Sequence, residues 1–567
     1  MTRNFISKNS RLALVAAVLF LAACQKRVPI VQIPKTPLGD GGKILRQFYR
    51  GFWEPPGSDD ESITIGLVPS ATRVRFRTLS TTVIRVFSEI ESFEIVAEPG
   101  TTFRVEAKNL VRPAMVTYLP IVETRLLPRS RALASSSEQY WKDRGFSKTR
   151  WMGPPAMDLP DLGSHLQRWA LSLDEPMARD EAKAVCARAR KIRAGCRILP
   201  RVDLPPLARG RIEMEDGPFA KLFEGFVEIQ SEGGQVRVLD FLAEPRVEKL
   251  SEETYATPAY VLPLDQHRVS LVQKARLRDY LDAVVPSEIF ASAALEAVKA
   301  QAVVARTYAM RHLSKSTDPE PFMICASTLC QVYRGVGYVH PNASRAVRET
   351  ASMVLWSHEG EPAETFYHGI CGGHTESQFV LRSDDPEPYL AGISDFPDGK
   401  ERRLTTDDAV ARYLQSPASN DAYCGASTFT KADRWRWTET HDRAALEKIV
   451  AKAGLSGTLT DLRSVARGVS GRILSLKIVT SQGSKIIQGE LAIRTLFGGL
   501  LSSLMLLEPT RERGVITALT IRGAGYGHGV GLCQVGAIGR AEAGQSFGQI
   551  LEAYYPGTTL APIGSPK

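Results

Sequence analysis

Apolar and polar residues alternate along much of the first half of the chain, and this pattern predicts β-strands. From Ile63, the segment ITIGLVPSATRVRFRTLSTTVIRV alternates with a period of two and is rich in β-branched residues. We expect two strands there, joined by a turn near residues 69–71. Further strand patterns follow in TTFRVEAKN, RGRIEMED, FEGFVEIQ and QVRVLDFL. The pattern therefore predicts a β-rich region over residues 61–255.

A helical pattern interrupts this β-rich region at about residues 164–203. There, LQRWALSLDEP predicts a strand, MARDEAKAVCARARKIRAG a helix that ends at Gly195, and CRILPRV a second strand. This strand–helix–strand insert loosely resembles the sporulation-related repeat, which binds peptidoglycan glycan. The alternative, which we favour, is an insert that only packs against its neighbours and holds no ligand.

The second half of the chain mixes both periodicities. HRVSLVQKA and RILSLKIVT predict strands, and residues 294–312 and 443–453 predict helices. The first helix is expected to begin near Ser292 as its N-cap. Its buried stripe is predicted to consist of Leu295, Val298, Ala302, Ala305 and Ala309. The chain is thus expected to be an α+β protein, with a mixed core over residues 256–562 behind a β-rich N-terminal accessory region.

The N-terminus has the features of a secretory signal at residues 1–23. Three basic residues precede an apolar run at 12–23, which is too short for a membrane-spanning helix. The run ends in LAAC, which resembles the bacterial lipobox and implies cleavage before Cys24 and lipid attachment to that cysteine. A plain signal peptide with an incidental cysteine is the alternative. Residues 24–60 then suit a tether, and Gln25 favours the outer membrane if the host has one.

Export to an oxidising compartment changes the interpretation of the other cysteines. Close pairs are then more often disulfides than metal ligands. The alternative at Cys325 and Cys330 is a zinc site completed by His312 or His340, although no C-x-x-C or H-E-x-x-H spacing supports it. We expect three disulfides, with Cys533 left free: Cys325–Cys330, Cys371–Cys424 and Cys186–Cys196.

Length and charge narrow the picture further. A chain of 567 residues is long enough for two or three domains. The net charge of +9 arises from 71 basic and 62 acidic residues, which is a mixed surface and not a basic arm. Since no basic stripe or nucleic-acid motif is present, the sequence does not predict nucleic-acid binding.

One acidic residue stands in an unusually apolar setting. Glu288 lies in the segment VVPSEIF, before the alanine-rich helix. Apolar neighbours favour the protonated form of a carboxyl group, as a general acid requires at neutral pH. The alternative is an acid that merely favours a helix N-terminus. Within the following helix, Gln301 and Tyr308 share one face, and Lys299 and Arg306 share another.

Two glycine-rich stretches supply further candidates. ETFYHGICGGHTES places two histidines around paired glycines, whose backbone can approach a ligand closely. GAGYGHGVGLCQVG contains another histidine and a glutamine among glycines. Small residues mixed with polar ones suit a groove for an extended polymer such as a sugar chain. The candidate substrate-binding residues are Gln301, Tyr308, His368, Gly372, Gly373, His374, His528 and Gln534.

Four motifs together identify a known family. The segments YLDAVVPSEIFASAALEAVKAQAVVARTYAM, FYHGICGGHTES, PYLAGISD and GHGVGLCQVGAIGRAEAGQSFGQILEAYYPGT resemble the stage II sporulation protein D and amidase-enhancer family. The resemblance covers about residues 260–562. It implies a lytic transglycosylase that cuts peptidoglycan glycan strands, preferentially those stripped of stem peptides. By position, Glu288 matches the catalytic acid and Arg306 a basic residue needed for function. Some members bind zinc near the segment CQVY, here residues 330–333.

The implied chemistry explains a single acid in an apolar setting. A lytic transglycosylase needs one carboxyl group that first donates a proton and then accepts one, whereas ordinary glycosidases use two carboxylates. The resemblance implies no required cofactor. It implies glycan strands as substrate and a cell-wall amidase as a second partner, while the predicted lipobox implies a membrane-anchored location facing the periplasm or cell wall. A non-catalytic, glycan-binding scaffold that stimulates or positions an amidase is the alternative function.

Overall fold

The computed structural model describes most of the chain after the N-terminal tether. The described residues are 30–32, 44–45, 48, 60–89, 91–127, 131–152, 167–193, 195–242, 250–312, 320–381, 386–416 and 421–563. The predicted signal at 1–23, the lipidation candidate Cys24 and most of the tether at 24–60 lie outside them. Among the described residues, every helix is too short or too polar to cross a membrane.

The chain folds into two compact units. The first comprises residues 1–55, 62–276 and 313–337, and the second comprises residues 56–61, 277–312 and 338–567. This division differs from the predicted boundary between residues 255 and 256. The difference arises because strands at 259–263 and 269–276 pair within the sheet of the first unit.

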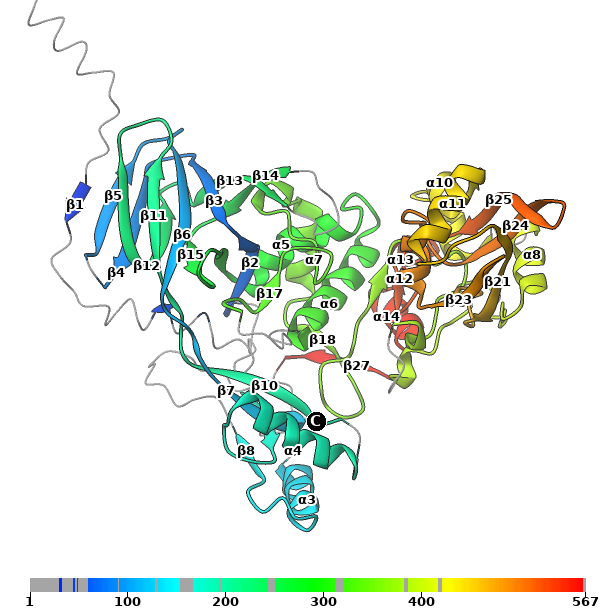
Figure 1. Ribbon diagram of the computed structural model, residues 1–567, viewed down its shortest axis with the longest axis horizontal. Coiled ribbons are helices and arrows are strands. Elements are labelled where there is room, and N and C mark those ends of the chain that lie inside the picture. The colour runs from blue at the N-terminus through cyan, green and yellow to red at the C-terminus, as the bar shows by residue number, and fades with distance from the viewer. Residues whose placement is uncertain are drawn as a thin grey trace, which may run out of the picture. The chain divides into compact units, whose positions relative to one another are not determined.

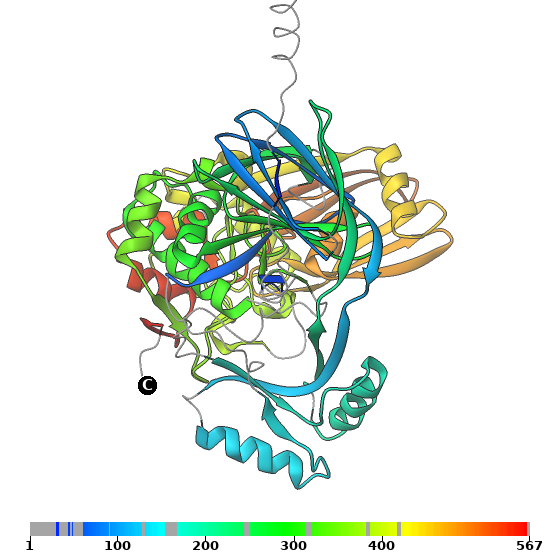
Figure 2. The same cartoon turned by 90° about the vertical axis from the view of Figure 1, so that its left-hand side faces the viewer.

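The first unit is built on a thirteen-stranded sheet, which is strongly twisted in Figures 1 and 2. Ten strands follow the order β14-β13-β3-β6-β11-β12-β15-β16-β2-β17, while β4 pairs with both β12 and β5, and β5 pairs with β1. The strands are β1 (Ile30–Gln32), β2 (Ser62–Ala71), β3 (Arg73–Thr78), β4 (Thr82–Ser88), β5 (Phe93–Ala97), β6 (Thr102–Arg112), β11 (Leu207–Met214), β12 (Ala220–Ser231), β13 (Gln235–Leu242), β14 (Leu250–Ala256), β15 (Ala259–Pro263), β16 (Val269–Arg276) and β17 (Ile324–Cys325).

The alternating pattern correctly predicts most of these strands, including β6, β11, β12 and β13. The first segment is an exception, because it forms three strands where two are predicted. Pro69 lies inside β2 and not in a turn. The pairing of β2 with β16 shifts register beside this proline, and such an irregularity tolerates a residue without an N–H.

The insert is larger than the predicted strand–helix–strand at 164–203. The predicted elements are β9 (Gln167–Ser172), α4 (Arg179–Arg190) and β10 (Arg197–Leu204), and they are joined by β7 (Met115–Leu127), α3 (Arg131–Lys142) and β8 (Arg150–Met152). The four strands form an antiparallel sheet in the order β10-β7-β9-β8. Helix α4 contacts β7 and β10, and a disulfide joins Cys186 of α4 to Cys196, next to β10.

The second unit centres on a buried helix. This helix is α6 (Leu295–His312), and it contacts α5 (Leu277–Glu288), α7 (Pro341–Glu349), α13 (Gln534–Glu542) and α14 (Phe547–Tyr554). Figure 1 shows α5, α6 and α7 side by side. Because four helices pack around it, α6 is buried on nearly every side from residue 297 to 310. The helix predicted over residues 294–312 is confirmed within one residue, although it begins at Leu295 and not directly after an N-cap at Ser292. Val298, Ala302, Ala305 and Ala309 of the predicted stripe are buried, but burial extends to nearly every other face of the helix as well.

The remainder of the second unit consists of small sheets and short helices. Strand β18 (Met353–Trp356) pairs with β27 (Thr559–Pro562), and β19 (Tyr367–His368) pairs with β26 (Leu532–Cys533). Two three-stranded sheets share one apolar core with α11 (Arg443–Lys452) and α12 (Glu490–Leu496). Their strands are β20 (Arg436–His441), β25 (Val515–Ala524) and β24 (Met505–Glu512) in one, and β21 (Leu459–Arg467), β22 (Ile473–Thr480) and β23 (Gly483–Gln488) in the other; α8 (Asp407–Gln415), α9 (Tyr423–Ala426) and α10 (Ala432–Trp435) complete the unit.

Candidate active site

Glu288 is the last residue of helix α5, and its side chain is half-buried. The residues around it in sequence are apolar, and Val284, Val285 and Ile289 are buried. Its position adds to the sequence analysis, which places Glu288 before the alanine-rich helix but does not predict the helix that ends at it. The C-terminal end of a helix carries partial negative charge and disfavours a carboxylate. The alternative role as a helix N-terminal acid is therefore wrong.

The hydroxyl of Tyr367 donates a hydrogen bond to the Glu288 carboxylate. Burial raises the pKa of Tyr367 well above its usual value, and the negative charge of Glu288 raises it further. Tyr367 therefore stays protonated and remains a donor at any physiological pH. Two more tyrosines lie close by: Tyr280 is fully buried in α5, and the Tyr308 ring meets the Tyr367 ring edge-on at 6.3 Å between centroids.

The short strand β19 holds Tyr367 in place. It runs parallel to β26, with Tyr367 opposite Leu532 and His368 opposite Cys533. The imidazole of His528 is hydrogen-bonded to the backbone of Tyr367, and its Nδ1 accepts from the Val530 N–H at 3.0 Å. Burial, followed by the neighbouring His368, lowers the pKa of His528 well below its usual value. His528 is therefore neutral and supports Tyr367 through its backbone.

His368 lies beside His528, with 5.5 Å between ring centroids. Its Nδ1 donates to the Val530 carbonyl at 3.1 Å, and its side chain is 5% exposed. Among the described residues, its Nε2 has no hydrogen-bond partner. The predicted candidates thus come together, because His368 lies on the same strand as Tyr367 and the ring of His528 contacts that of His368.

The paired glycines are packed against protein in this structure. Gly372 and Gly373 have φ angles of +83° and +104°, which favour glycine. A Cβ on Gly373 would lie 1.9 Å from the hydroxyl of Tyr413, and that hydroxyl donates to the Gly372 carbonyl. The close backbone approach predicted for a ligand is therefore made by Tyr413.

His374 is also buried, and its Nδ1 lies 2.6 Å from the Thr375 carbonyl. Gln534, the first residue of α13, is half-buried.

The polar candidates of α6 lie in the interior of the second unit. The Arg306 side chain is fully buried, and its guanidinium donates to the carbonyls of Val347 and Met353, both at 3.2 Å. Gln301 is also fully buried, and in the part of the chain that is described neither of its amide atoms has a hydrogen-bond partner. Tyr308 is 9% exposed and stacks on His312, with 4.0 Å between ring centroids.

The structure changes one of the predicted cysteine pairs. Disulfides join Cys186 to Cys196 and Cys325 to Cys330, so the last two sulfurs are not the thiolate ligands that the zinc alternative requires. The Sγ atoms of Cys371 and Cys424 are 3.3 Å apart, whereas a disulfide bond measures about 2.05 Å. The predicted Cys371–Cys424 disulfide is therefore not formed, because these thiols gather with a third one, Cys533.

Sequence reasoning missed two features beside Glu288. Tyr367 is one, because only the fold brings it to the carboxylate. The other is an exposed aromatic surface, in which Phe290 is 41% exposed and its ring lies 5.3 Å from that of Phe429. The Nζ of Lys431 lies 5.8 Å from the centre of the Phe290 ring. An exposed phenylalanine two positions after a candidate acid is a signal that could have been used.

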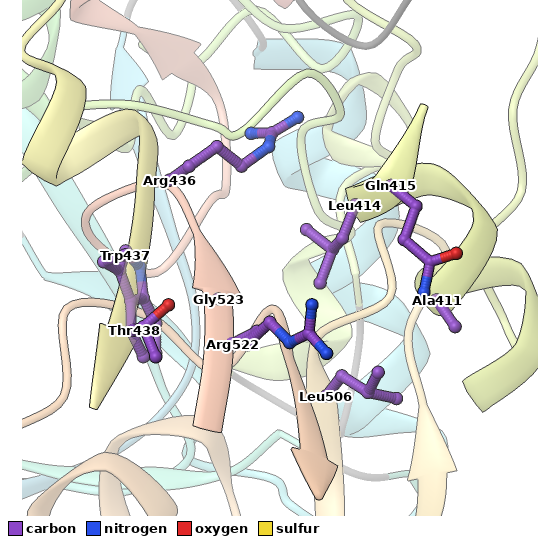
Figure 3. Close-up of a pocket in the computed structure, with 9 residues that line it drawn as sticks. All are labelled: Ala411, Leu414, Gln415, Arg436, Trp437, Thr438, Leu506, Arg522 and Gly523. Atoms are coloured by element: carbon purple, nitrogen blue, oxygen red, sulfur yellow. The ribbon is translucent and has the colours of Figure 1, made fainter. Parts of the chain in front are cut away.

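A separate cavity of about 200 Å³ lies elsewhere in the second unit (Figure 3). Arg436 and Arg522 both extend along its wall, and Arg522 forms a bidentate pair with Glu508 at 2.7 and 2.9 Å. The lining consists of Ala411, Leu414, Gln415, Arg436, Trp437, Thr438, Leu506, Arg522 and Gly523. The predicted site residues are not part of this lining.

Comparison with known proteins agrees with the motifs. A sequence model described as "Stage II sporulation protein" matches residues 265–356, and one described as a domain of unknown function matches residues 381–531. The amidase enhancer of Bacillus subtilis is 31% identical over 295 residues, which cover 49% of this chain and 40% of the relative. Stage II sporulation protein D of Bacillus subtilis is 25% identical over 324 residues, covering 54% of this chain and 81% of the relative.

A protein of Brachyspira hyodysenteriae that is named only as uncharacterized is 29% identical over 294 residues, covering 51% of this chain and 68% of the relative. The fold and the site define an α+β protein with a β-rich N-terminal region and a helical centre that presents one carboxyl group. The matched models and relatives make the assignment more specific. Residues 265–356 match the stage II sporulation protein model, and over about half its length the chain is similar to stage II sporulation protein D and to the amidase enhancer.

The surroundings of Arg306 predict that its replacement acts on stability. Arg306→Ala leaves the buried carbonyls of Val347 and Met353 unpaired, and each costs about 1–3 kcal/mol. Hydrogen exchange of α6 and α7 amides should therefore show a loss of stability of at least about 2 kcal/mol. Arg278→Ala is the control, since this residue forms a surface ion pair with Asp60, worth less than about 1 kcal/mol. An Arg306→Ala protein with unchanged exchange but no glycan binding would instead place the guanidinium at the substrate.

Proposed function

We propose that this protein is an exported lytic transglycosylase that cleaves denuded peptidoglycan strands, with Glu288 as its acid and base. The observation that carries the proposal is the half-buried Glu288 carboxyl group, held by the Tyr367 hydroxyl at the end of α5. Similarity to the stage II sporulation protein D and amidase-enhancer family supports a cell-wall role in general. The local geometry supports the particular reaction.

In the proposed reaction, one carboxyl group acts twice. Protonated Glu288 first donates its proton to the glycosidic oxygen, so that the bond between this oxygen and C1 of the muramyl residue breaks. The resulting carboxylate then accepts the proton of the C6 hydroxyl, whose oxygen bonds to C1 of the same sugar. The products are a free hydroxyl on the leaving sugar and a 1,6-anhydro end, and Glu288 is protonated again. No water is consumed and no second carboxylate is needed.

Tyr367 is a positioning residue in this scheme. Its hydroxyl fixes the carboxyl group while the proton moves, and His528 fixes the Tyr367 backbone. The exposed face of Phe290 offers an apolar surface on which a sugar ring can stack. A denuded strand carries the free lactyl carboxylate of muramic acid, and Lys431 beside Phe290 supplies a positive charge for it.

The alternative function is that of a glycan-binding scaffold that stimulates a cell-wall amidase. The specific observation in its favour is the 31% identity to a relative named amidase enhancer. The two functions differ in product, because a scaffold leaves no 1,6-anhydro ends. Incubation of purified protein with denuded glycan strands, followed by analysis of the ends by mass spectrometry, separates them.

The proposed location is a lipid-anchored one. LAAC at residues 21–24 supports lipid attachment at Cys24 after removal of the signal. We expect Cys24→Ala to leave the precursor unprocessed or to release the protein from membranes. Membrane fractionation with lipid labelling measures this, and Cys186→Ala is a control that leaves the lipobox intact. A Cys24→Ala protein that is still lipidated would rule out this anchor.

The hydrogen bond from Tyr367 predicts a change in pH dependence. Tyr367→Phe removes a bond to the charged form of Glu288, worth about 1.5–3 kcal/mol. Glu288 must begin protonated, so activity is lost as it ionises. Because the variant destabilises the carboxylate, the alkaline limb of kcat should move to higher pH by about one to two units. Tyr260→Phe, which removes a tyrosine–glutamate bond of 2.9 Å in the first unit, should leave the limb in place.

The proposed acid itself gives the most direct test. Glu288→Gln keeps the shape of the side chain but removes the transferable proton, and such assistance is typically worth 10²–10⁴-fold. Formation of 1,6-anhydro ends should fall by about this factor, while a pull-down with denuded glycan should be unchanged. Equal product from variant and wild type would remove Glu288 from the chemistry. No product from either protein, with intact binding, would favour the scaffold.

A further inference from the structure

Three thiols and one carboxylate meet in the interior of the second unit. They belong to Cys371, Cys424, Cys533 and Asp395, and all four side chains are 0% exposed. Their potential ligand atoms all lie within 4.8 Å of one another. The four residues come from segments that are far apart in sequence, so the fold gathers them, not a local motif. None of them has a part in the proposed reaction.

The spacing of these atoms suits a four-coordinate metal ion. The Sγ of Cys371 lies 3.3 Å from the Sγ of Cys424 and 3.6 Å from Oδ2 of Asp395. A tetrahedral zinc ion with bonds of about 2.3 Å to sulfur and about 2.0–2.2 Å to oxygen separates its ligands by roughly 3.4–3.8 Å. A buried site with four protein ligands is the arrangement of a structural zinc centre.

Backbone N–H groups point at the sulfur atoms. The Sγ of Cys533 accepts from the N–H groups of Cys371 and Gly536 at 3.1 and 3.2 Å, and the Sγ of Cys371 accepts from that of Gly373 at 3.2 Å. Cys533 is also the N-cap of α13, where a helix favours a thiolate.

The carboxylate is oriented by its own partners, as metal-ligating carboxylates usually are. Arg540 donates to Oδ1 of Asp395 at 2.8 and 3.0 Å, and the hydroxyl of Tyr554 donates to Oδ2 at 2.8 Å. A Cβ on Gly536 would lie 2.5 Å from Oδ2, so only glycine fits beside the cluster.

We propose that Cys371, Cys424, Cys533 and Asp395 bind a divalent metal ion of the zinc class in a closed structural site. Binding releases the protons of the three thiols, and the complex of three thiolates and one carboxylate carries a charge of −2. Arg540 offsets one of these charges directly. The buried Arg472 donates to the Cys371 carbonyl at 3.1 Å and offsets part of the rest, since it also faces Glu376. This site is separate from Cys325 and Cys330.

The ion would tie together the segments that hold Tyr367. Cys533 lies on β26, which pairs with the strand that carries Tyr367, and Cys371 follows that strand by three residues. The expected role is structural, because all four ligands are buried and leave no open position for substrate. Loss of the ion should loosen β19 and β26 before it affects any other strand of the second unit.

Metal content of the purified full chain tests the proposal without any glycan. We expect about one zinc per chain by elemental analysis. After chelation, added Co²⁺ should give the sulfur-to-cobalt charge-transfer and intense visible bands of tetrahedral thiolate coordination. Asp395→Asn keeps the shape of the side chain and should weaken binding at least about 10-fold, and Cys424→Ser should weaken it more. The double variant Cys325→Ala/Cys330→Ala is the control and should retain the full metal content.

Two results would overturn the proposal. One is a metal-free protein in which peptide mass spectrometry finds a Cys371–Cys424 disulfide, which would make the cluster a covalent cross-link. The other is loss of zinc from the Cys325→Ala/Cys330→Ala control with full binding in Cys424→Ser. Because a variant can lose metal by misfolding, circular dichroism accompanies each measurement. Addition of Co²⁺ to the chelated wild-type protein, followed by measurement of the cobalt spectrum, is a test that needs no variant.

Discussion

The parallel pairing of β19 with β26 is the interaction on which the candidate site depends. It joins two glycine-rich motifs, in which His368 and Val530 are 162 residues apart and hydrogen-bonded. The pairing brings Tyr367 to Glu288 and brings Cys533 to the thiol cluster. Two paired residues per strand give little stability alone, so the surrounding contacts must hold them. Gly531 shows how close the approach is, because a Cβ there would lie 1.9 Å from the Phe366 carbonyl.

The buried polar residues of α6 show that a residue in a family motif can act by holding other elements in place. Arg306 donates to the carbonyls of Val347 in α7 and Met353 in β18, so it fixes how these elements pack on α6. A guanidinium with several fixed donors suits this role better than a lysine would. The same helix contacts α5, which ends at Glu288. The position of Glu288 therefore depends on the packing of α6. Arg306, which is buried away from solvent, contributes to that packing.

The sequence predicts those parts of the structure whose signal is local. Alternation over residues 102–112 and 207–242 correctly predicts strands, because each strand buries one face. Helix α11 at 443–452 is also close to its predicted bounds. The extent of burial of α6 is missed, because its stripe pattern does not reveal that four other helices cover it. Tyr367 and the thiol cluster are missed because contacts between distant segments leave no periodicity in the sequence.

The environment of Glu288 combines effects of opposite sign, and this combination suits a group that must both give and take a proton. The C-terminal end of α5 and the apolar neighbours favour the protonated form. The Tyr367 hydroxyl favours the carboxylate. If only the first effects were present, the acid would donate poorly; if only the second were present, it would be ionised before donation. A carboxyl group balanced between them can serve both steps at one pH, which is what a single-acid mechanism requires and a two-carboxylate glycosidase does not.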